Sequence, residues 1–181
     1  AHEENPALGL RGLRALRVKE NILRDQLNAL AIAQNKTSAD LWVMAPMVSD
    51  AEETDYFVAL AKELGIKVAG VMAEVPSLAL VADQVLETAD FVSIGTNDLT
   101  HYTLGLSRQS GLATLADTRK PEVLELIRGV VEAAKTAGKP VGVCGEAASD
   151  PETARQLIEL GVDSLSASPS LLPGLRLDLQ N

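Results

Sequence analysis

The chain has 181 residues, which is enough for one sizeable domain with its own core. Its formal net charge of −9 argues against binding of nucleic acid, because a polyanion requires many clustered lysine and arginine side chains. No apolar run is long enough to cross a membrane, and a single cysteine fits a reducing compartment. We therefore expect a cytoplasmic protein that binds neither nucleic acid nor membrane.

The N-terminal part is expected to be helical. Apolar residues recur at roughly helical intervals between Leu8 and Leu30, and arginines occupy the remaining surface. Residues 6–10 are a candidate for a short strand, and residues 34–40 are polar and predicted to form a loop.

From residue 41 onward, predicted strands and helices alternate. Apolar runs predict strands at residues 41–45, 68–73, 91–95, 141–144 and 164–167. Capping residues and helical spacing predict helices at residues 50–64, 77–87, 121–137 and 150–160. Residues 96–110 are expected to form a polar turn, and Pro169 and Pro173 are expected to break the structure that follows the last strand.

The alternation predicts an α/β fold with a parallel sheet covered by helices. An open doubly wound sheet and a barrel both fit the strand spacing. Unusual polar residues at several strand ends favour a barrel, where active sites gather at the C-terminal ends of the strands. A closed (β/α)8 TIM-type barrel needs about 250 residues. Only five strands are clear, or six with residues 6–10, so we expect an incomplete barrel.

Two acidic residues follow successive predicted strands. Glu74 comes after strand 68–73, and Asp98 lies in the segment Thr-Asn-Asp-Leu-Thr after strand 91–95. A barrel places them side by side, and Mg²⁺ binds through one or two carboxylates together with waters and phosphate oxygens. The alternative is that both residues are helix caps, which explains Asp98 well and Glu74 poorly.

Two arginines are candidates for binding phosphate, which the planar guanidinium group recognises through paired hydrogen bonds. Arg108 follows the Asn-Asp segment closely, and Arg11 lies between Gly9 and Gly12. A solvated arginine on a helix surface is the commoner situation, and the sequence leaves that alternative open for both.

Cys144 occurs in the segment Val-Gly-Val-Cys-Gly-Glu at the end of a predicted strand. A single cysteine on a buried strand usually acts as a small apolar residue. The flanking glycines indicate instead an open strand end, where a thiol can act as an acid or a nucleophile. Glu146 either orients this thiol or begins the next turn. His101 is a further candidate lining residue, but no second histidine has the spacing of a zinc site.

Four segments together resemble one known family. They are residues 5–14 (NPALGLRGLR), 70–76 (GVMAEVP), 90–108 (DFVSIGTNDLTHYTLGLSR) and 141–148 (VGVCGEAA). They resemble the C-terminal, phosphoenolpyruvate-binding domain of enzyme I of the bacterial phosphotransferase system, phosphoenolpyruvate–protein phosphotransferase. The resemblance runs from about residue 4 to residue 177. Phosphoenolpyruvate synthase and pyruvate phosphate dikinase share the barrel and related motifs, but residues 100–106 look closer to enzyme I.

The resemblance implies a role for each candidate residue. Arg11 and Arg108 would clamp the phosphoryl group, and Asn97 with the backbone around Asp98 would hold the substrate. Glu74 and Asp98 would bind Mg²⁺ as the cofactor. Cys144 would be the general acid that protonates the methylene carbon of the enolate. The implied partners are phosphoenolpyruvate and pyruvate, a phosphohistidine domain of the same enzyme, and a second copy in a homodimer.

The chain also departs from the family pattern. The family usually has Gln at the position of His101 and Asp at that of Ser107, both near Arg108. The phosphohistidine domain and the first barrel strands have no counterpart in residues 1–181, which we treat as one partial barrel domain.

Two functional hypotheses follow. The first is a transferase module that passes the phosphoryl group of phosphoenolpyruvate to a histidine on a separate domain, which initiates sugar uptake. The alternative is an inert phosphoenolpyruvate-binding or dimerisation fragment, or a domain of the phosphoenolpyruvate synthase or pyruvate phosphate dikinase type.

Overall fold

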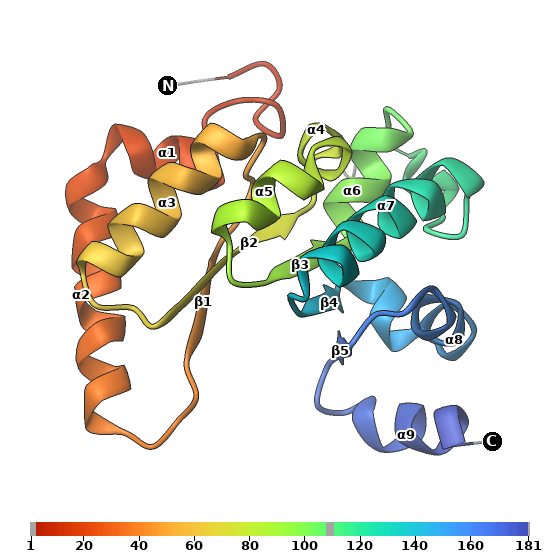
Figure 1. Ribbon diagram of the computed structural model, residues 1–181. Helices are drawn as coiled ribbons and strands as arrows, with labels where there is room; N and C mark the ends of the chain where they lie inside the picture. The colour runs from red at the N-terminus through yellow and green to blue at the C-terminus, as the bar shows by residue number, and fades with distance from the viewer. Residues whose placement is uncertain (1–2, 108–110, 181) are drawn as a thin grey trace.

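The computed structural model describes residues 3–107 and 111–180. In this part of the chain, five parallel strands form one sheet: β1 Trp42–Ala45, β2 Val68–Ala73, β3 Val92–Gly95, β4 Val141–Cys144 and β5 Ser164–Ser166. The spatial order of the strands is the same as their order in the chain (Figure 1). A doubly wound sheet reverses direction at a switch point, whereas each crossover here steps the same way. The predicted fold class is confirmed, as consecutive strands of an incomplete TIM-type barrel.

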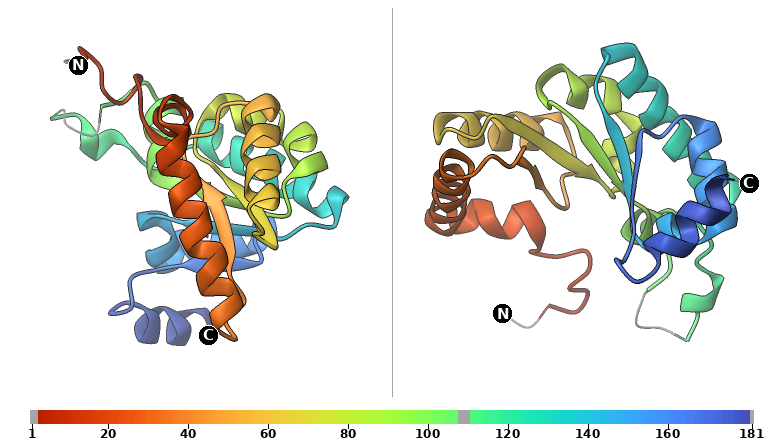
Figure 2. Two further views of the ribbon diagram at one scale, coloured as in Figure 1. Left: turned by 90° about the vertical axis from the view of Figure 1, so that its left-hand side faces the viewer. Right: turned by 90° about the horizontal axis from the view of Figure 1, so that it is seen from below.

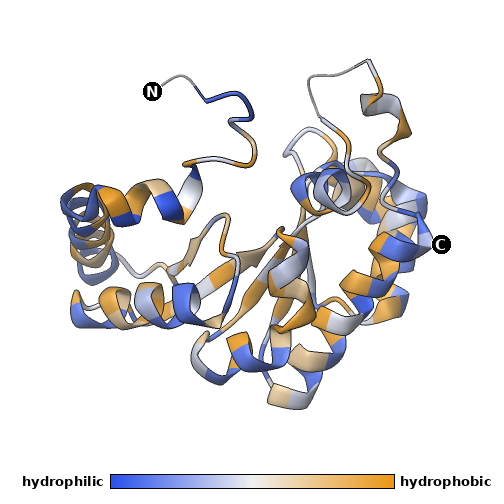
Figure 3. Ribbon diagram, turned by 90° about the horizontal axis from the view of Figure 1, so that it is seen from above, coloured by the Kyte–Doolittle hydropathy of each residue, from blue (hydrophilic) through white to orange (hydrophobic). Residues whose placement is uncertain are grey.

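The helices form an arc outside the strands, which the view from below makes clear (Figure 2). Their bounds are α1 Gly12–Val18, α2 Glu20–Lys36, α3 Ala51–Glu63, α4 Pro76–Leu80, α5 Ala82–Thr88, α6 Thr96–Thr103, α7 Pro121–Ala137, α8 Pro151–Leu160 and α9 Leu172–Gln180. Two short 3₁₀ helices, η1 Ala113–Leu115 and η2 Glu146–Ser149, lie in the connections. Hydrophobic and hydrophilic stripes alternate around the helices, as expected when one face packs on a sheet (Figure 3).

The predicted caps position several helix ends. The Asp50 carboxylate accepts a hydrogen bond from the backbone N–H of Glu53 at 2.8 Å and so begins α3. The Asp150 carboxylate accepts a hydrogen bond from the backbone N–H of Thr153 at 2.9 Å and so begins α8. Gly138 ends α7 in the left-handed conformation, with φ of 65°.

The two faces of the sheet differ in chemistry because side chains alternate along each strand. Val71, Ile94 and Val143 are buried on the helix-covered side, in a continuous aliphatic core. Ser93 and Cys144 lie on the opposite side, where the hydroxyl approaches the sulfur at 3.8 Å. The inner face of the partial barrel therefore carries the polar and reactive groups.

Several predicted elements differ from the structure. The segment after β3 is helical and not a turn, because Thr96 begins α6 immediately after the strand. The predicted helix 77–87 is two helices separated at Val81, and the N-terminal helical region divides at Lys19. Residues 6–10 form turns and bends, so no strand forms there. Pro173 lies in the first turn of α9, where a missing backbone N–H costs nothing.

In the described ranges 3–107 and 111–180, no helix combines the length and apolar character needed to cross a bilayer.

Candidate functional site

Three neighbouring strands end at one edge of the sheet. Ala73 pairs with Ile94, and Gly95 pairs with Cys144 across parallel ladders. Because strands β2, β3 and β4 are parallel, the residues that follow them meet at this edge. Glu74, the Asn97–Asp98 pair and Cys144 therefore lie at the C-terminal ends of adjacent strands, where barrel enzymes carry their active sites.

Glu74 is a buried carboxylate held by the backbone of the turn that follows β1. Its side chain is only 5% exposed, and Oε1 accepts a hydrogen bond from the N–H of Met47 at 2.8 Å. A methyl carbon placed on Gly95 would lie 2.7 Å from Glu74 Oε2, so only glycine leaves room for this carboxylate. The N-cap of α4 is Val75, so the alternative that Glu74 caps a helix is wrong.

Met47 owes its orientation to a close approach between two backbone turns. It is a non-glycine residue with a positive φ of 56°, which L-residues adopt at a cost. Gly12, with φ of 55°, packs against it, and a methyl carbon there would lie 2.4 Å from Met47 Cβ. Leu13 donates its N–H to the carbonyl of Pro46 at 3.1 Å. The turn after β1 thus positions both Glu74 and the start of α1, where Arg11 lies.

Arg11 faces the first turns of α6. It precedes α1 as the N-cap residue, in an extended conformation. Its Nη1 lies 3.6 Å from Asp98 Oδ1 and donates a hydrogen bond to the hydroxyl of Tyr102 at 3.1 Å. Asp98 does not cap α6; it lies in the first turn, where a carboxylate is stabilised by the helix dipole. Arg11 and Asp98, two of the candidate residues, are therefore neighbours in the structure.

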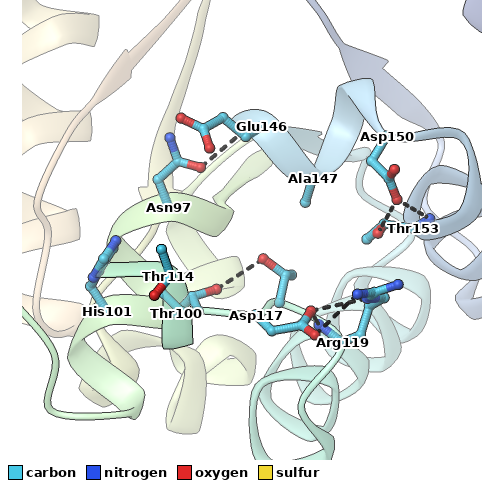
Figure 4. A pocket seen from close by; sticks show the side chains of 12 residues that line it. Asn97, Thr100, His101, Thr114, Asp117, Arg119, Glu146, Ala147, Asp150 and Thr153 are labelled. Atoms are coloured by element: carbon cyan, nitrogen blue, oxygen red, sulfur yellow. Dashed lines mark hydrogen bonds and ion pairs between the residues drawn. The ribbon is translucent and has the colours of Figure 1, made fainter. Parts of the chain in front are cut away.

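Asn97 connects the end of β3 to the end of β4. Its side-chain oxygen accepts the backbone N–H of Glu146 at 3.0 Å, as the close-up shows (Figure 4). Thr96 is fully buried and donates its hydroxyl to the carbonyl of Cys144 at 2.9 Å. Gly145, with φ of 101°, allows this approach, because a methyl carbon there would lie 2.5 Å from Thr96 Oγ1. Glu146 begins η2 with an exposed side chain, so it starts the next turn and does not orient the thiol.

The Cys144 thiol lies on the inner face, half-buried between two strands. Its sulfur is 3.8 Å from Ser93 Oγ and 3.6 Å from the carbonyl oxygen of Ile94. Burial raises the pKa of the thiol, the hydrogen bond from Ser93 lowers it, and the negative charge of Glu74 raises it. The net direction is upward, so the thiol is protonated at neutral pH.

The charge of Glu74 also affects Tyr102, together with the charges of Arg11 and Asp98. Burial raises the pKa of this phenol, Arg11 lowers it, and Asp98 and Glu74 raise it. Glu74 therefore acts electrostatically on both Cys144 and Tyr102. The acidic groups, the guanidinium and the thiol share one electrostatic environment.

Two cavities adjoin these residues. The first has a volume of about 580 Å³, lies between α6, η2 and the start of α8, and is lined by Asn97, His101 and Glu146 among others (Figure 4). The second has a volume of about 700 Å³ and is lined by Arg11, Asp98 and Tyr102, with residues 3–8 and 105–107 as walls. His101 borders both cavities, and its Nδ1 is buried without a hydrogen-bond partner among the described residues.

The donor set fits magnesium better than zinc. Among residues 3–107 and 111–180, no three histidine, cysteine, aspartate or glutamate side chains cluster as metal ligands. Zinc usually needs three or four such ligands, whereas magnesium binds through one or two carboxylates plus substrate phosphate and water. Glu74 and Asp98 supply carboxylates from the ends of adjacent strands, which matches the second requirement.

The structure brings together Arg11, Glu74, Asn97, Asp98 and Cys144 at one edge. Arg108 lies outside the described residues. Sequence reasoning missed Tyr102 and Met47. Tyr102 follows Asp98 by one helical turn, a signal that is available only once the segment is recognised as a helix. Met47 acts through its backbone, which no side-chain pattern reveals.

The comparisons with known proteins agree with this geometry. The family model described as "PEP-utilising enzyme, PEP-binding domain" matches residues 1–181. The chain therefore belongs to the phosphoenolpyruvate-utilising enzymes and corresponds to their phosphoenolpyruvate-binding domain.

Among its relatives, the phosphoenolpyruvate–protein phosphotransferase of Streptomyces coelicolor is 47% identical over 179 residues, which cover 98% of this chain and 32% of that protein. The multiphosphoryl transfer protein of Xanthomonas campestris is 42% identical over 99% of this chain and 22% of its own length. The phosphoenolpyruvate synthase of Pyrococcus furiosus is 40% identical over 96% of this chain and 22% of its own length. The chain thus spans a third or less of these relatives.

Solved structures support the fold. A citrate lyase from Burkholderia xenovorans superposes with a TM-score of 0.65 at 17% identity, over 86% of this chain and 53% of that one. The citrate lyase beta subunit of M. tuberculosis, complexed with oxaloacetate and magnesium, superposes with a TM-score of 0.54 at 17% identity, over 78% and 63% of the two chains. At this level of identity, the likeness concerns the fold alone.

Proposed function

We propose that this chain is the phosphoenolpyruvate-binding catalytic domain of a phosphoenolpyruvate–protein phosphotransferase, with residues 1–181 acting as one partial barrel domain. It passes the phosphoryl group of phosphoenolpyruvate to a histidine on a separate domain. The observation that carries the proposal is the convergence of Arg11 and Asp98, 3.6 Å apart, with Glu74 and Cys144 at the ends of the flanking strands. The 47% identity to the Streptomyces enzyme favours this activity over its alternatives.

Phosphoryl transfer depends on positioning and charge neutralisation more than on covalent chemistry. Arg11 and Arg108 bind the oxygens of the phosphoryl group through their guanidinium forks. Asn97 orients the substrate from the start of α6. Glu74 and Asp98 would hold Mg²⁺, which would supply positive charge to offset the negative charge of the substrate.

Cys144 completes the reaction by supplying a proton. When the phosphoryl group leaves the enol oxygen for a histidine nitrogen, the electron pair of the broken P–O bond remains on the pyruvate enolate. The thiol then donates its proton to the methylene carbon, and pyruvate forms. The resulting thiolate regains a proton from solvent. The raised pKa of Cys144 fits this role, because a thiol acts as an acid only while it is protonated.

Titration calorimetry with phosphoenolpyruvate, with and without Mg²⁺, tests the proposal. We expect metal-dependent binding that Arg11→Ala weakens by roughly tenfold to a hundredfold, because a charge-assisted hydrogen bond to phosphate is lost. Arg24→Ala is the matched control, since that guanidinium pairs with Glu20 and Glu63 on the α2–α3 surface. Undetectable binding by the unaltered chain at millimolar ligand would favour the inert-fragment alternative.

A domain of the phosphoenolpyruvate synthase type is the second candidate, favoured by the 40% identity to the Pyrococcus furiosus protein. The two candidates differ in the domain that accepts the phosphoryl group. Incubation of the chain with Mg²⁺, phosphoenolpyruvate and the N-terminal part of either relative separates them. We expect phosphohistidine with the Streptomyces phosphotransferase portion, and formation only with the Pyrococcus portion would reverse the assignment.

A further inference from the structure

We propose that Tyr102 is a positioning residue for Arg11. Its hydroxyl holds the guanidinium beside Asp98 and at the same time fastens the N-terminal segment, defined as residues 3–10, across the site. The inference rests on the proposed function for the identity of the ligand, although the contacts that it assigns exist without ligand.

Tyr102 and Asp98 lie one turn apart on α6, so their side chains project from the same side of the helix. Both approach the same guanidinium nitrogen: Nη1 of Arg11 donates to the phenol at 3.1 Å and lies 3.6 Å from the carboxylate. Among the described residues, both contacts of this guanidinium use Nη1. The side chain of Arg11 is 36% exposed, and we assign the edge formed by Nε and Nη2 to the oxygens of a phosphoryl group.

The phenol makes a second hydrogen bond in the other direction. Having accepted a hydrogen bond from Arg11, it donates its own proton to the carbonyl oxygen of Ala7. A phenol has one proton to donate, so this hydroxyl links the two partners in a single chain of hydrogen bonds. Arg11, Tyr102 and the N-terminal segment are thereby connected.

The N-terminal segment is folded back on itself where Tyr102 holds it. The Glu3 carboxylate accepts the backbone N–H of Leu10 at 3.1 Å, and Leu8 donates its N–H to the carbonyl of Asn5 at 2.9 Å. Most of this segment forms one wall of the cavity of about 700 Å³, and residues 105–107 form part of the other. Tyr102 therefore links Arg11, which lines this cavity, to the N-terminal segment that forms one of its walls.

A long arginine side chain loses rotamer freedom when it binds a ligand, and this loss of entropy opposes binding. A hydrogen bond that fixes the guanidinium beforehand removes part of that cost. Tyr102→Phe deletes the hydroxyl and keeps the ring. We expect the Kd for phosphoenolpyruvate to rise about tenfold, as for the loss of one preorganising contact. Pyruvate has no phosphoryl group for Arg11 to bind, so its Kd should stay within about twofold.

Titration calorimetry in the presence of Mg²⁺ measures the Kd for phosphoenolpyruvate and the Kd for pyruvate, and so shows whether only the first changes. The other tyrosine of the chain supplies the control: Tyr56 donates its hydroxyl to Glu20 Oε2 at 3.0 Å on the α2–α3 surface, and Tyr56→Phe should leave both affinities unchanged. The effect of Tyr102→Phe should also vanish in an Arg11→Ala background, because the hydroxyl acts through that guanidinium. The inference would be overturned if Tyr102→Phe weakened the binding of both ligands equally or of neither. It would also be overturned if Tyr102→Phe weakened phosphoenolpyruvate binding just as much in the Arg11→Ala background.

Amide hydrogen exchange without ligand provides the second measurement. We expect the amides of Leu8 and Leu10 to exchange faster in Tyr102→Phe than in the unaltered chain and in Tyr56→Phe, because the N-terminal segment loses its hydrogen bond to the Tyr102 hydroxyl. Unchanged exchange at both amides would overturn the inference. If the unaltered chain fails to bind phosphoenolpyruvate, the proposed function is wrong, and the exchange rates still decide the role of Tyr102.

Discussion

At the scale of single residues, the chemistry of Cys144 depends on three neighbouring influences. Burial disfavours the thiolate, the Glu74 carboxylate disfavours it further, and the Ser93 hydroxyl favours it. Since the upward influences dominate, the pKa lies above the ordinary thiol value of 9.0. The thiol of Cys144 therefore remains protonated over the neutral pH range.

This balance predicts opposite shifts from two substitutions. In Glu74→Gln the negative charge is lost, so the pKa of the thiol should fall; in Ser93→Ala the hydrogen bond is lost, so it should rise. The rate of alkylation by iodoacetamide, measured against pH in EDTA, follows the thiolate fraction, and Cys144 is the only cysteine in the chain. The pH profile of alkylation should shift to lower pH in Glu74→Gln and to higher pH in Ser93→Ala, relative to the unaltered chain. Shifts in the same direction would contradict the assigned neighbours.

The close approach of Gly12 to Met47 predicts a graded loss of stability. In Gly12→Ala the new methyl group meets Met47 Cβ and the backbone also keeps a positive φ, so we expect about 2–4 kcal/mol of destabilisation. Gly138→Ala is the matched control, with φ of 65° and nothing within 4 Å of its added carbon. Gly138→Ala should lower the free energy of unfolding by about 1 kcal/mol. Urea unfolding measures both, and equal losses would show that the contact with Met47 is unimportant.

At the scale of elements, strands and capped helices could be predicted because their signals are local. Apolar runs mark strand β4, and Pro121 with Gly138 marks the two ends of α7. The helix α6 could not be predicted in this way. It begins directly after β3 with polar residues, and its stability comes from packing of Leu99 into the core, which is a tertiary effect.

The candidate site was predictable to the same extent. Residues at strand ends, such as Glu74 and Cys144, stand out because a polar group or a thiol follows an apolar run. The contact from Tyr102 depends on the helical register of α6, and the hydrogen bond from Met47 depends on its backbone conformation. Neither is encoded in spacing alone.

The N-cap of α8 predicts a stability change that depends on pH. Asp150→Ala should lower the free energy of unfolding by about 1 kcal/mol near neutral pH, as for the loss of an N-cap. Hydrogen bonds from Thr153, side chain first and then backbone, hold the pKa of Asp150 below its ordinary value of 3.8. The stability that comes from the charge of Asp150 is therefore fully present above pH 3.8, the unfolded-state pKa. It is lost as the pH falls through the lower pKa of Asp150 in the folded chain.

Asp150→Asn is the control for this prediction, because Asn also caps helices but carries no titrating group. Its free energy of unfolding, measured by denaturant titration at several pH values, should converge with that of the unaltered chain in acid. A constant difference between the two across the acidic range would show that Asp150 does not contribute through its charge.

At the scale of the whole molecule, the described sheet has two edges, formed by β1 and β5. Parallel sheets are usually covered on both faces, and native proteins usually shield an exposed edge strand. Trp42 on β1 nevertheless remains 43% exposed, and it rests against the ring of Phe91 with centroids 5.0 Å apart. Edge and inner face together form a surface suited to pairing with another chain.

We therefore predict concentration-dependent self-association of the chain in sedimentation velocity experiments. Trp42→Glu should shift the equilibrium toward monomer, because a charge on the pairing surface would be desolvated. Ile158→Glu, at a residue of α8 that is 45% exposed and lies on neither edge strand, is the control and should leave association unchanged. A monomer at every concentration, or equal effects of the two substitutions, would refute the predicted dimer.

Replacement of Mg²⁺ by paramagnetic Mn²⁺ in the presence of phosphoenolpyruvate, with the backbone amide resonances of the chain recorded by NMR, tests directly whether these residues form one ligand site. We expect broadening centred on the ends of three adjacent strands, at Glu74, at Asn97 and Asp98, and at Cys144, and extending to Arg11. We expect weaker broadening without phosphoenolpyruvate, because phosphate oxygens of the ligand would complete the coordination of the metal. Broadening centred elsewhere, for example around Asp117 in the cavity beside α8, would contradict the proposed site.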